Sequence, residues 1–227
     1  MSLQSKIISY WNLDGNSTDE VGANDGTDTN ITYSTANGKI NQGAGFNGTS
    51  SKINVGASTS LKITGAFSIS VWIKRSGSQT QYSPIFYKPH DVSLNEAYWL
   101  GFWGSSDSKI TLGFYDGSGY QFLTSDTEIS DLTWTHIVGS YDGTYLRIYI
   151  NGTEDKNSNI GSKTISYSGD YDAWIGQEKS TKFIKGAIDM LGIADEALTS
   201  DDVAQLYNSG AGMQWPFITF TSKVRIM

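Results

Sequence analysis

The sequence predicts an all-β protein, a sandwich of two antiparallel sheets with one short helix near the carboxyl end. Three observations support this prediction. Aromatic residues make up 13% of the 227 residues, and aromatic side chains favour strands. Glycine is abundant, at 25 residues, and suits the tight turns between short strands. Finally, short segments with alternating apolar side chains recur along the chain and end at Gly, Asn, Asp or Ser.

Nine segments show the strand pattern. In chain order they are residues 7–13, 51–55, 67–74, 98–103, 109–115, 134–141, 145–150, 174–177 and 187–194. The clearest turn is Asp142-Gly143-Thr144, because Asp-Gly between two alternating apolar runs is a strong hairpin signal. Alternating strands bury one face each, so the pattern predicts two antiparallel sheets that face each other. A parallel sheet is excluded because its crossover helices are missing.

One helix is predicted, over residues 199–208. Thr199 or Ser200 can cap its start, and Asp202 lies in the first turn, where the helix dipole favours a carboxylate. Leu206 belongs to its apolar stripe, and Gly210 suits the position just beyond its end. We expect residues 211–227 to form a terminal strand or an arm toward another chain. The whole chain, 1–227, is interpreted as one domain with a core at about residues 7–210.

Composition excludes several classes of function. The net charge is −7 and the sequence pI about 4.7, so the surface repels phosphate backbones and nucleic-acid binding is not expected. The absence of cysteine excludes disulfides, thiolate metal sites and a cysteine nucleophile. No apolar run approaches the roughly 20 residues needed to span a bilayer, so membrane insertion is not expected.

Several motifs, in their order along the chain, resemble concanavalin A-like, laminin-G-type domains of bacterial surface and phage proteins. These motifs are Ile8-Ser9-Tyr10-Trp11-Asn12-Leu13-Asp14, Gly43-Ala44-Gly45-Phe46-Asn47-Gly48, Phe67-Ser68-Ile69-Ser70-Val71-Trp72-Ile73, Trp134-Thr135-His136-Ile137-Val138 and Gly186-Ala187-Ile188-Asp189. The resemblance implies a jelly-roll sandwich and a place outside the cell, at the cell surface or on a virion. Function does not follow from it, because this fold carries lectins, glycosidases and adhesion modules alike.

Catalysis is not expected. Glucanases with this architecture resemble one another in a Glu-x-Asp-x-(x)-Glu signature on one strand, which places two carboxylates on either side of a glycosidic bond. No such signature occurs in this sequence. The two histidines, His90 in a loop and His136 in a strand, stand apart from any serine and aspartate that would complete a triad. We therefore predict a non-catalytic protein.

Calcium is the expected cofactor, in a structural role. Related domains often hold one calcium ion between the opening segment and the closing strand. The resemblance assigns its ligands to Asp189, to Asp14 and Asp19, and to the backbone carbonyl of Gly48. In the alternative interpretation, Asp19 is a turn residue and Asp189 caps a hairpin.

A pair of tryptophans is the strongest candidate for ligand binding. The alternation in residues 98–103 places Trp99 and Trp103 on the face opposite Leu100, with Gly101 between them. We expect both indoles to be exposed and to stack on sugar rings, with Tyr115 and Tyr120 extending the platform. In the alternative interpretation, one tryptophan is buried under a long loop or in a subunit contact.

Together these observations favour a non-catalytic binding module that recognises carbohydrate on an extracellular or virion surface. The alternative is a structural or protein-interaction module, such as a phage decoration or tail component or a piece of an adhesin. A glycoside hydrolase is the least supported function. The expected partners are therefore a glycan or a surface protein, with self-assembly through the C-terminal arm as a further expectation.

Overall fold

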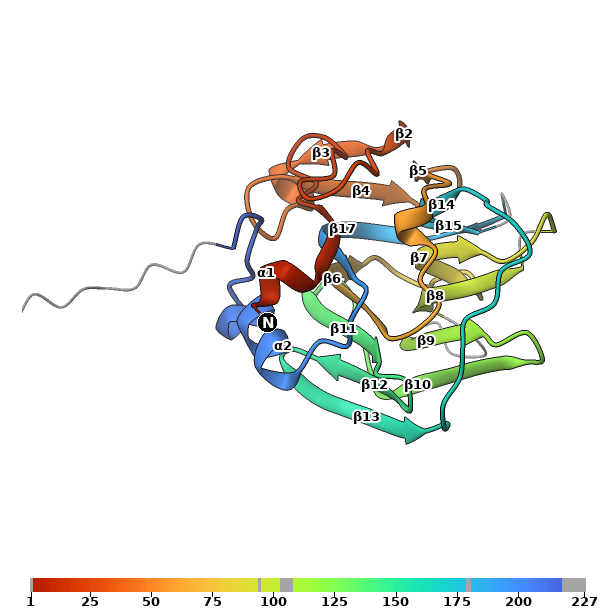
Figure 1. Cartoon of the computed structure of the whole chain (residues 1–227). Helices are drawn as coiled ribbons and strands as arrows, with labels where there is room; N and C mark the ends of the chain where they lie inside the picture. The colour runs from red at the N-terminus through yellow and green to blue at the C-terminus, as the bar shows by residue number, and fades with distance from the viewer. Residues whose placement is uncertain (1, 94, 103–107, 179–180, 218–227) are drawn as a thin grey trace, which may run out of the picture.

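The computed structural model describes residues 2–93, 95–102, 108–178 and 181–217, and two large sheets packed face to face make up most of it (Figure 1). Every strand pairing in the described ranges is antiparallel. The predicted all-β jelly-roll sandwich with a short helix near the carboxyl end is thereby confirmed.

One sheet, which we call the helix-covered sheet, has strands from both ends of the chain. Its order is β13 (Thr153–Asn159), β12 (Tyr145–Ile150), β11 (Thr135–Tyr141), β6 (Phe67–Arg75), β17 (Lys185–Ala194), β4 (Gly43–Asn47) and β3 (Thr32–Ser34), with β1 (Ile7–Trp11) also paired to β17. The central pair β6 and β17 therefore joins the first third of the chain to its last strand.

The other sheet, which we call the second sheet, contains the segments predicted to bind ligand. Its order is β10 (Tyr120–Glu128), β9 (Lys109–Tyr115), β8 (Glu96–Phe102), β7 (Ser83–Pro89), β14 (Ala173–Ile175), β5 (Lys52–Gly56) and β2 (Thr27–Thr29). A small ribbon beside it pairs β15 (Gln177–Glu178) with β16 (Lys182–Phe183).

The main core lies between the two sheets. Alternate residues of β6, among them Phe67, Ile69 and Val71, are fully buried there against inward residues of the second sheet such as Leu100 and Leu112. Burial of such apolar surface is the main favourable contribution to folding. Because one face of these strands is buried in this core, the alternation of apolar residues in the sequence indicates which side chains point inward.

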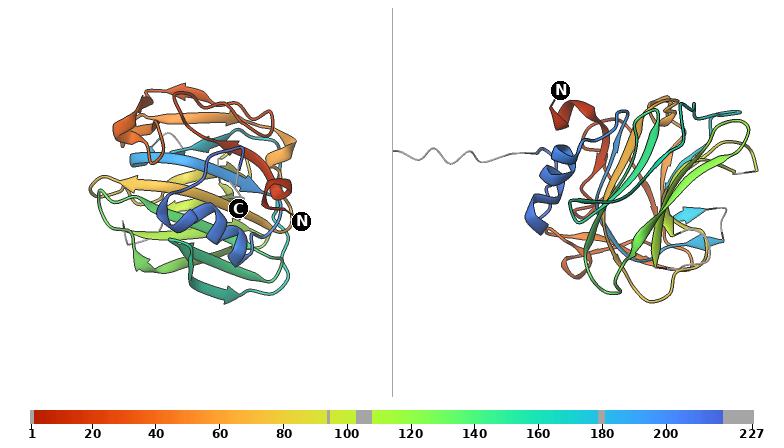
Figure 2. Two further views of the ribbon diagram at one scale, coloured as in Figure 1. Left: turned by 90° about the vertical axis from the view of Figure 1, so that its left-hand side faces the viewer. Right: turned by 90° about the horizontal axis from the view of Figure 1, so that it is seen from below.

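A second apolar layer covers the outside of the helix-covered sheet. It lies beneath α1 (Leu3–Lys6) and α2 (Ser200–Tyr207), and Figure 2 shows α2 on the outside of the sandwich. Trp72 and Val138 of the sheet pack there with Val203 and Leu206 of α2. Three 3₁₀ turns complete the described elements: η1 (Thr35–Asn37), η2 (Thr59–Leu61) and η3 (Asn208–Gly210).

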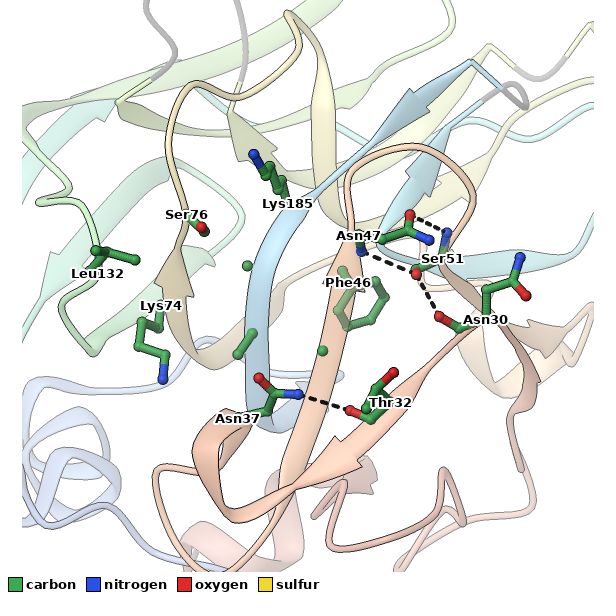
Figure 3. A pocket seen from close by; sticks show the side chains of 13 residues that line it. Asn30, Thr32, Asn37, Phe46, Asn47, Ser51, Lys74, Ser76, Leu132 and Lys185 are labelled. Carbon is green, nitrogen blue, oxygen red and sulfur yellow. Dashed lines mark hydrogen bonds between the residues drawn. The ribbon is translucent and has the colours of Figure 1, made fainter.

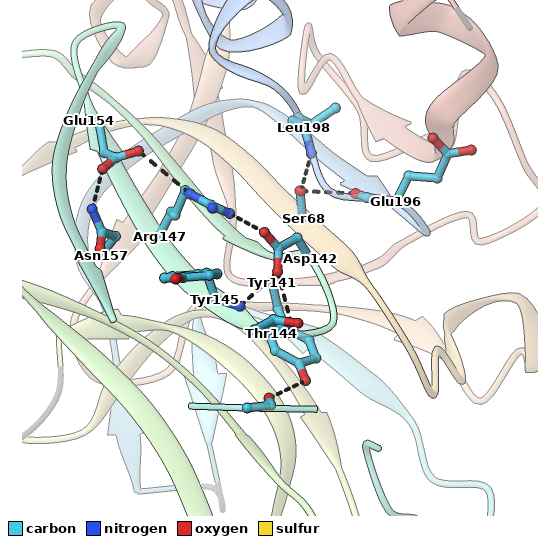
Figure 4. Close-up of polar contacts among 11 residues, drawn as sticks. Ser68, Tyr141, Asp142, Thr144, Tyr145, Arg147, Glu154, Asn157, Glu196 and Leu198 are labelled. Carbon is cyan, nitrogen blue, oxygen red and sulfur yellow. Dashed lines mark hydrogen bonds and ion pairs between the residues drawn. The ribbon is translucent and has the colours of Figure 1, made fainter. Parts of the chain in front are cut away.

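The predicted hairpin at Asp142-Gly143-Thr144 is confirmed between β11 and β12 (Figure 4). Asp142 accepts backbone N–H groups of Thr144 at 2.8 Å and Tyr145 at 2.7 Å, and Gly143 has a φ of 95°. The sharp turn therefore depends on one carboxylate acceptor and one residue that tolerates the left-handed region.

Several elements escaped sequence analysis. Strand β13 lies at a sheet edge and is made of polar residues, so it carries no apolar period. Strand β7 contains Pro84 and Pro89, which argue against a strand in a sequence. The expectation of a single helix was also wrong, because α1 forms a helix of 4 residues that precedes the first strand.

The C-terminal segment packs back onto the domain as far as the structure describes it. The hydroxyl of Tyr10 donates to the carbonyl of Met213 at 2.7 Å, and Asn12 exchanges two hydrogen bonds with the backbone of Trp215. Residues 211–217 therefore lie against β1 and do not project as an arm. The remainder of the segment expected to form a terminal strand or an arm, residues 218–227, lies outside the described residues. In the described part of the chain, no helix has the length and apolar character needed to cross a membrane.

Candidate functional site

The outer face of the second sheet carries a row of aromatic side chains. Trp99 of β8 pairs with Gly113 of β9, which in turn pairs with Phe122 of β10. Two residues further along, Tyr115 pairs with Tyr120. Because side chains alternate between faces, these five positions share the face opposite the core residues Leu100 and Phe114. The predicted orientation of Trp99 is therefore confirmed.

The predicted exposure of Trp99 is wrong, since its side chain is only 1% exposed. A Cβ atom at Gly113 would lie 2.3 Å from Cζ2 of Trp99, so the indole rests directly against the β9 backbone. The indole and the ring of Tyr120 meet edge to face, with centroids 5.8 Å apart and planes at 77°. Trp99 thus supports a neighbouring ring from beneath instead of facing solvent. Trp103 lies outside the described residues.

The two predicted tyrosines do come together. Their ring centroids are 5.2 Å apart, and Tyr120 remains 44% exposed while Tyr115 is half-buried. Beside them, the ring of His90 meets the ring of Tyr115 at 4.8 Å. With Asp91 and Asn95 these residues line a hollow of about 300 Å³, which we call the aromatic hollow.

Polar groups in the aromatic hollow are held in place by local hydrogen bonds. Asp91 accepts the backbone N–H of Asn95 at 3.1 Å and its side-chain amide at 2.7 Å. Burial acts to raise the pKa of Asp91, but these bonds and His90 lower the pKa below its usual value. Nδ1 of His90 lies 2.8 Å from the carbonyl of Ser166, which fixes the ring. The hollow therefore presents a charged carboxylate beside aromatic rings.

Two buried glutamates, Glu96 and Glu178, lie close to tyrosines of the second sheet. Burial raises the pKa of Tyr120, and so do a hydrogen bond to Glu96 and its negative charge. Burial also raises the pKa of Tyr87, together with the charges of Glu96 and Glu178. Both glutamates are less than 10% exposed. Glu96 and Glu178 are thus acids within strands, but their burial does not suit attack on a polysaccharide.

The four predicted calcium ligands do not fit a single ion. Asp19 accepts the backbone N–H groups of Tyr10, Val21 and Asn24 at 2.9 to 3.1 Å, and these use both of its oxygens. Three amide hydrogens thus occupy acceptor positions of Asp19 that calcium coordination would otherwise use. The alternative interpretation of Asp19 as a turn residue therefore describes its contacts.

Asp189 lies apart from Gly48. Strand β17 pairs Lys185 with Asn47, so Asp189 is four residues, roughly 13 Å, along the strand from the Gly48 turn. Oδ2 of Asp189 accepts the N–H groups of Lys39 and Ile40 at 2.7 and 3.0 Å. Burial raises the pKa of Asp189 to about 7, and the charge of Asp14 adds to the shift. No cluster of three or more His, Cys, Asp or Glu side chains suited to a metal occurs among the described residues.

Sequence reasoning missed most of the polar half of the aromatic hollow. The sequence predicts a loop position for His90 and gives no separate indication of Asp91 or Asn95. The sequence did contain a signal. His90 and Asp91 follow Pro89 directly in a loop, and loops at the rim of a sandwich often carry function. Their meeting with Tyr115 depends on the pairing of β7, β8 and β9, which the sequence does not display.

Solved structures with the same fold include domains that were determined with sugars. The fourth domain of an extracellular arabinanase from Geobacillus stearothermophilus, in complex with arabinotriose, has a TM-score of 0.72 and 24% identity, covering 92% of this chain and 98% of that domain. The binding domain of botulinum neurotoxin DC in complex with SialylT has a TM-score of 0.65 and 16% identity, covering 92% and 52%. At these identities the likeness shows the fold.

The binding domain of Paraclostridial Mosquitocidal Protein 1 is similar to the same extent, with a TM-score of 0.68 and 17% identity over 92% of this chain. The chain spans about half the length of these toxin binding domains. Comparison with curated protein sequences found no match. A family model described as the concanavalin A-like lectin/glucanases superfamily matches residues 47–204, more than half of the chain. This protein therefore belongs to the concanavalin A-like lectin/glucanases superfamily, as the motifs in its sequence implied.

Proposed function

We propose that this protein is a non-catalytic carbohydrate-binding module that acts outside the cell or on a virion surface. The observation that carries the proposal is the aromatic hollow, where the exposed ring of Tyr120 lies beside Tyr115, with Asp91 and Asn95 at hydrogen-bonding distance of each other. Aromatic faces match the apolar faces of sugar rings, while carboxylates and amides bind hydroxyl groups.

The surroundings support binding over hydrolysis. Hydrolysis needs two carboxylates that reach the scissile bond from either side. Glu96 and Glu178 are buried, and Glu96 accepts a hydrogen bond from Tyr120. Similar structures were solved with arabinotriose and with SialylT, and the arabinanase among them is extracellular. These likenesses support a sugar ligand and an extracellular setting as proposals for this chain.

The test is a glycan panel that includes arabinotriose and a sialylated oligosaccharide, followed by titration of wild type and Tyr120→Ala. Stacking of one ring is worth roughly 1 to 3 kcal/mol by analogy with bases on aromatic side chains, so the variant should bind about tenfold more weakly. Melting curves are recorded beside the titrations, because the variant also loses the contact with Trp99 and the hydrogen bond to buried Glu96, and affinities are compared at a temperature where both proteins are folded.

Tyr145→Ala is the matched control, since Tyr145 lies on the helix-covered sheet and packs against Arg147, 5.0 Å from its ring. Equal loss of affinity in both variants would contradict a site at the aromatic hollow. A panel without any bound glycan, together with association of the protein with itself or with a surface protein, would favour the interaction-module alternative. The exposed Phe122 beside Tyr120 would then be the first contact to test.

A further inference from the structure

A second hollow lies on the opposite side of the sandwich, on the outer face of the helix-covered sheet. It measures about 450 Å³, and we call it the lysine groove (Figure 3). Its floor follows one row of paired residues across four strands, from Thr32 through Gly45 and Ala187 to Lys74. Gly45 and Ala187 carry little or no side chain, so a ligand can approach the sheet closely.

Charge distinguishes this groove from the rest of the molecule. The chain has a net charge of −7, yet the charged side chains that line the groove are Lys74 and Lys185, and no lining residue is acidic. Within the described residues, neither lysine forms an ion pair. Cations that line a hollow and lack a carboxylate partner attract anions, and the low-dielectric walls strengthen that attraction.

The two lysines are held at the groove in different ways. Nζ of Lys74 donates to the carbonyl of Ala36 at 2.6 Å and lies 5.1 Å from the centre of the Trp134 ring. Two of its three hydrogens remain for a ligand. Lys185 is exposed, and its side chain runs past Gly48. The lysines are diagonal neighbours on paired strands, so their stems start roughly 7 to 8 Å apart.

Neutral hydrogen-bonding groups are also available in the groove. Asn37 donates its amide N–H to the carbonyl of Thr32 at 3.0 Å, and its amide oxygen accepts no bond from a described residue. Asn47 does not contribute, because its side-chain oxygen already accepts backbone N–H groups of Thr49, Ser50 and Ser51. The groove therefore offers amide and hydroxyl groups in addition to its two cations.

An apolar side chain stands at the rim. Leu132 is 66% exposed and has a φ of 54°, a conformation uncommon for a residue other than glycine. Its backbone N–H donates to Arg75 at 2.9 Å, and Asp131 accepts the N–H of Gly77 at 2.6 Å. These bonds present Leu132 toward the groove, with Lys74 on the same side of β17 and Thr32 on the other (Figure 3).

We infer that the lysine groove binds an acidic saccharide, one that carries carboxylate or sulfate groups. The two ammonium groups would bind separate acidic groups, Asn37 and the hydroxyls would bind sugar hydroxyls, and Leu132 would cover an apolar ring face. An extended acidic peptide is less suited, because β4 and β17 have neighbours on both sides and their backbone groups are already paired. This inference concerns a site separate from the aromatic hollow and does not depend on it.

The experiment is isothermal titration of wild type with tetragalacturonic acid, with a sulfated tetrasaccharide and with the carboxyl-reduced, neutral form of the first. Wild type should bind at least one acidic probe, more weakly as salt rises, and the neutral form much more weakly. Lys185→Gln should lose roughly tenfold in affinity, since hydrogen bonds to charged groups are worth about 1.5 to 3 kcal/mol. The two acidic probes then show whether carboxylate or sulfate is preferred.

Lys109→Gln is the matched control, because it removes the same charge from β9 of the second sheet. Leu132→Asn tests the rim, since asparagine tolerates the left-handed conformation and lacks the apolar contact. The inference is overturned if wild type binds no acidic probe, if the neutral probe binds equally well, or if both lysine variants lose the same affinity. Preferential binding of an acidic peptide would overturn it too.

Tyr120→Ala should leave the binding of acidic probes unchanged. Failure of the lysine groove and failure of the aromatic hollow are therefore distinguishable.

Discussion

At the scale of single residues, glycines decide where the large rings can lie. Gly113 leaves space on the β9 backbone that the indole of Trp99 fills. The buried indole then meets Tyr120 edge to face, a favourable arrangement for aromatic rings. The exposed ring of Tyr120, proposed to stack on sugar, is therefore positioned with the help of a glycine on the neighbouring strand β9.

Gly113→Ala should destabilise the protein by about 1 to 3 kcal/mol, because its Cβ would meet Trp99 at 2.3 Å and the ring cannot move without losing its packing. Urea denaturation measures the effect. Gly119→Ala serves as the control, since its Cβ would meet nothing within 4 Å. Equal stability of the two variants would show that Trp99 is not held against β9.

At the scale of elements, α2 depends on one carboxylate that serves several partners. Asp202 accepts the backbone N–H and the hydroxyl of Thr199 at 2.9 and 2.8 Å, and it forms a buried ion pair with Lys6 at 2.6 Å. Burial acts to raise the pKa of Asp202, but Lys6 and Thr199 lower it below its usual value. Asp202 thus completes the capping box of α2 and, through its ion pair with Lys6, connects α2 to the short α1.

Thr199→Ala should cost about 1 kcal/mol of stability, because the first turn loses its side-chain acceptor for the Asp202 N–H. Thr199→Ser should retain most of the stability, since serine supplies the same hydroxyl. The comparison is made by thermal and urea unfolding. An alanine variant as stable as wild type would mean that packing of Val203 and Leu206 alone maintains α2.

At the scale of the whole molecule, the layer between α2 and the helix-covered sheet links stability to pH. His136 is buried there against the rings of Trp72 and Tyr207, and its Nε2 lies 3.0 Å from the hydroxyl of Ser70. Burial lowers the pKa of His136 to about 3, whereas an unfolded histidine titrates near 6.5. The folded state therefore requires a neutral ring.

Between about pH 3 and 6.5 the unfolded chain binds a proton at His136 that the folded chain does not, so this residue makes stability rise with pH, by up to about 1.4 kcal/mol per unit. Above about pH 6.5 the ring is neutral in the folded and the unfolded state, so His136 no longer makes stability depend on pH. Asp189, whose pKa burial raises to about 7, acts in the opposite direction. His136→Gln should remove the first slope alone, so we expect the stability difference between variant and wild type to change steadily from pH 4 to about pH 6 and to level off near pH 7. A difference independent of pH would contradict the buried neutral ring.

The sequence by itself determined the two sheets, the hairpin at Asp142 and the cap of α2. Each of these follows from neighbouring residues, namely the alternation of side chains, a turn dipeptide and a Thr199-Ser200 pair before an acidic first turn, of which the structure selects Thr199 as the cap. The superfamily could be inferred for the same reason, since its motifs are short local patterns in a defined order.

Only the tertiary structure decided which of these residues meet and which are exposed. The alternation placed Trp99 on the correct face, but its burial depends on Gly113 of another strand. Lys74 and Lys185 lie more than a hundred positions apart in the chain and share a groove because β6 and β17 pair. Asp189 and Gly48 lie apart because the register of β4 and β17 separates them. Strand order and register are long-range properties, which local periodicity does not specify.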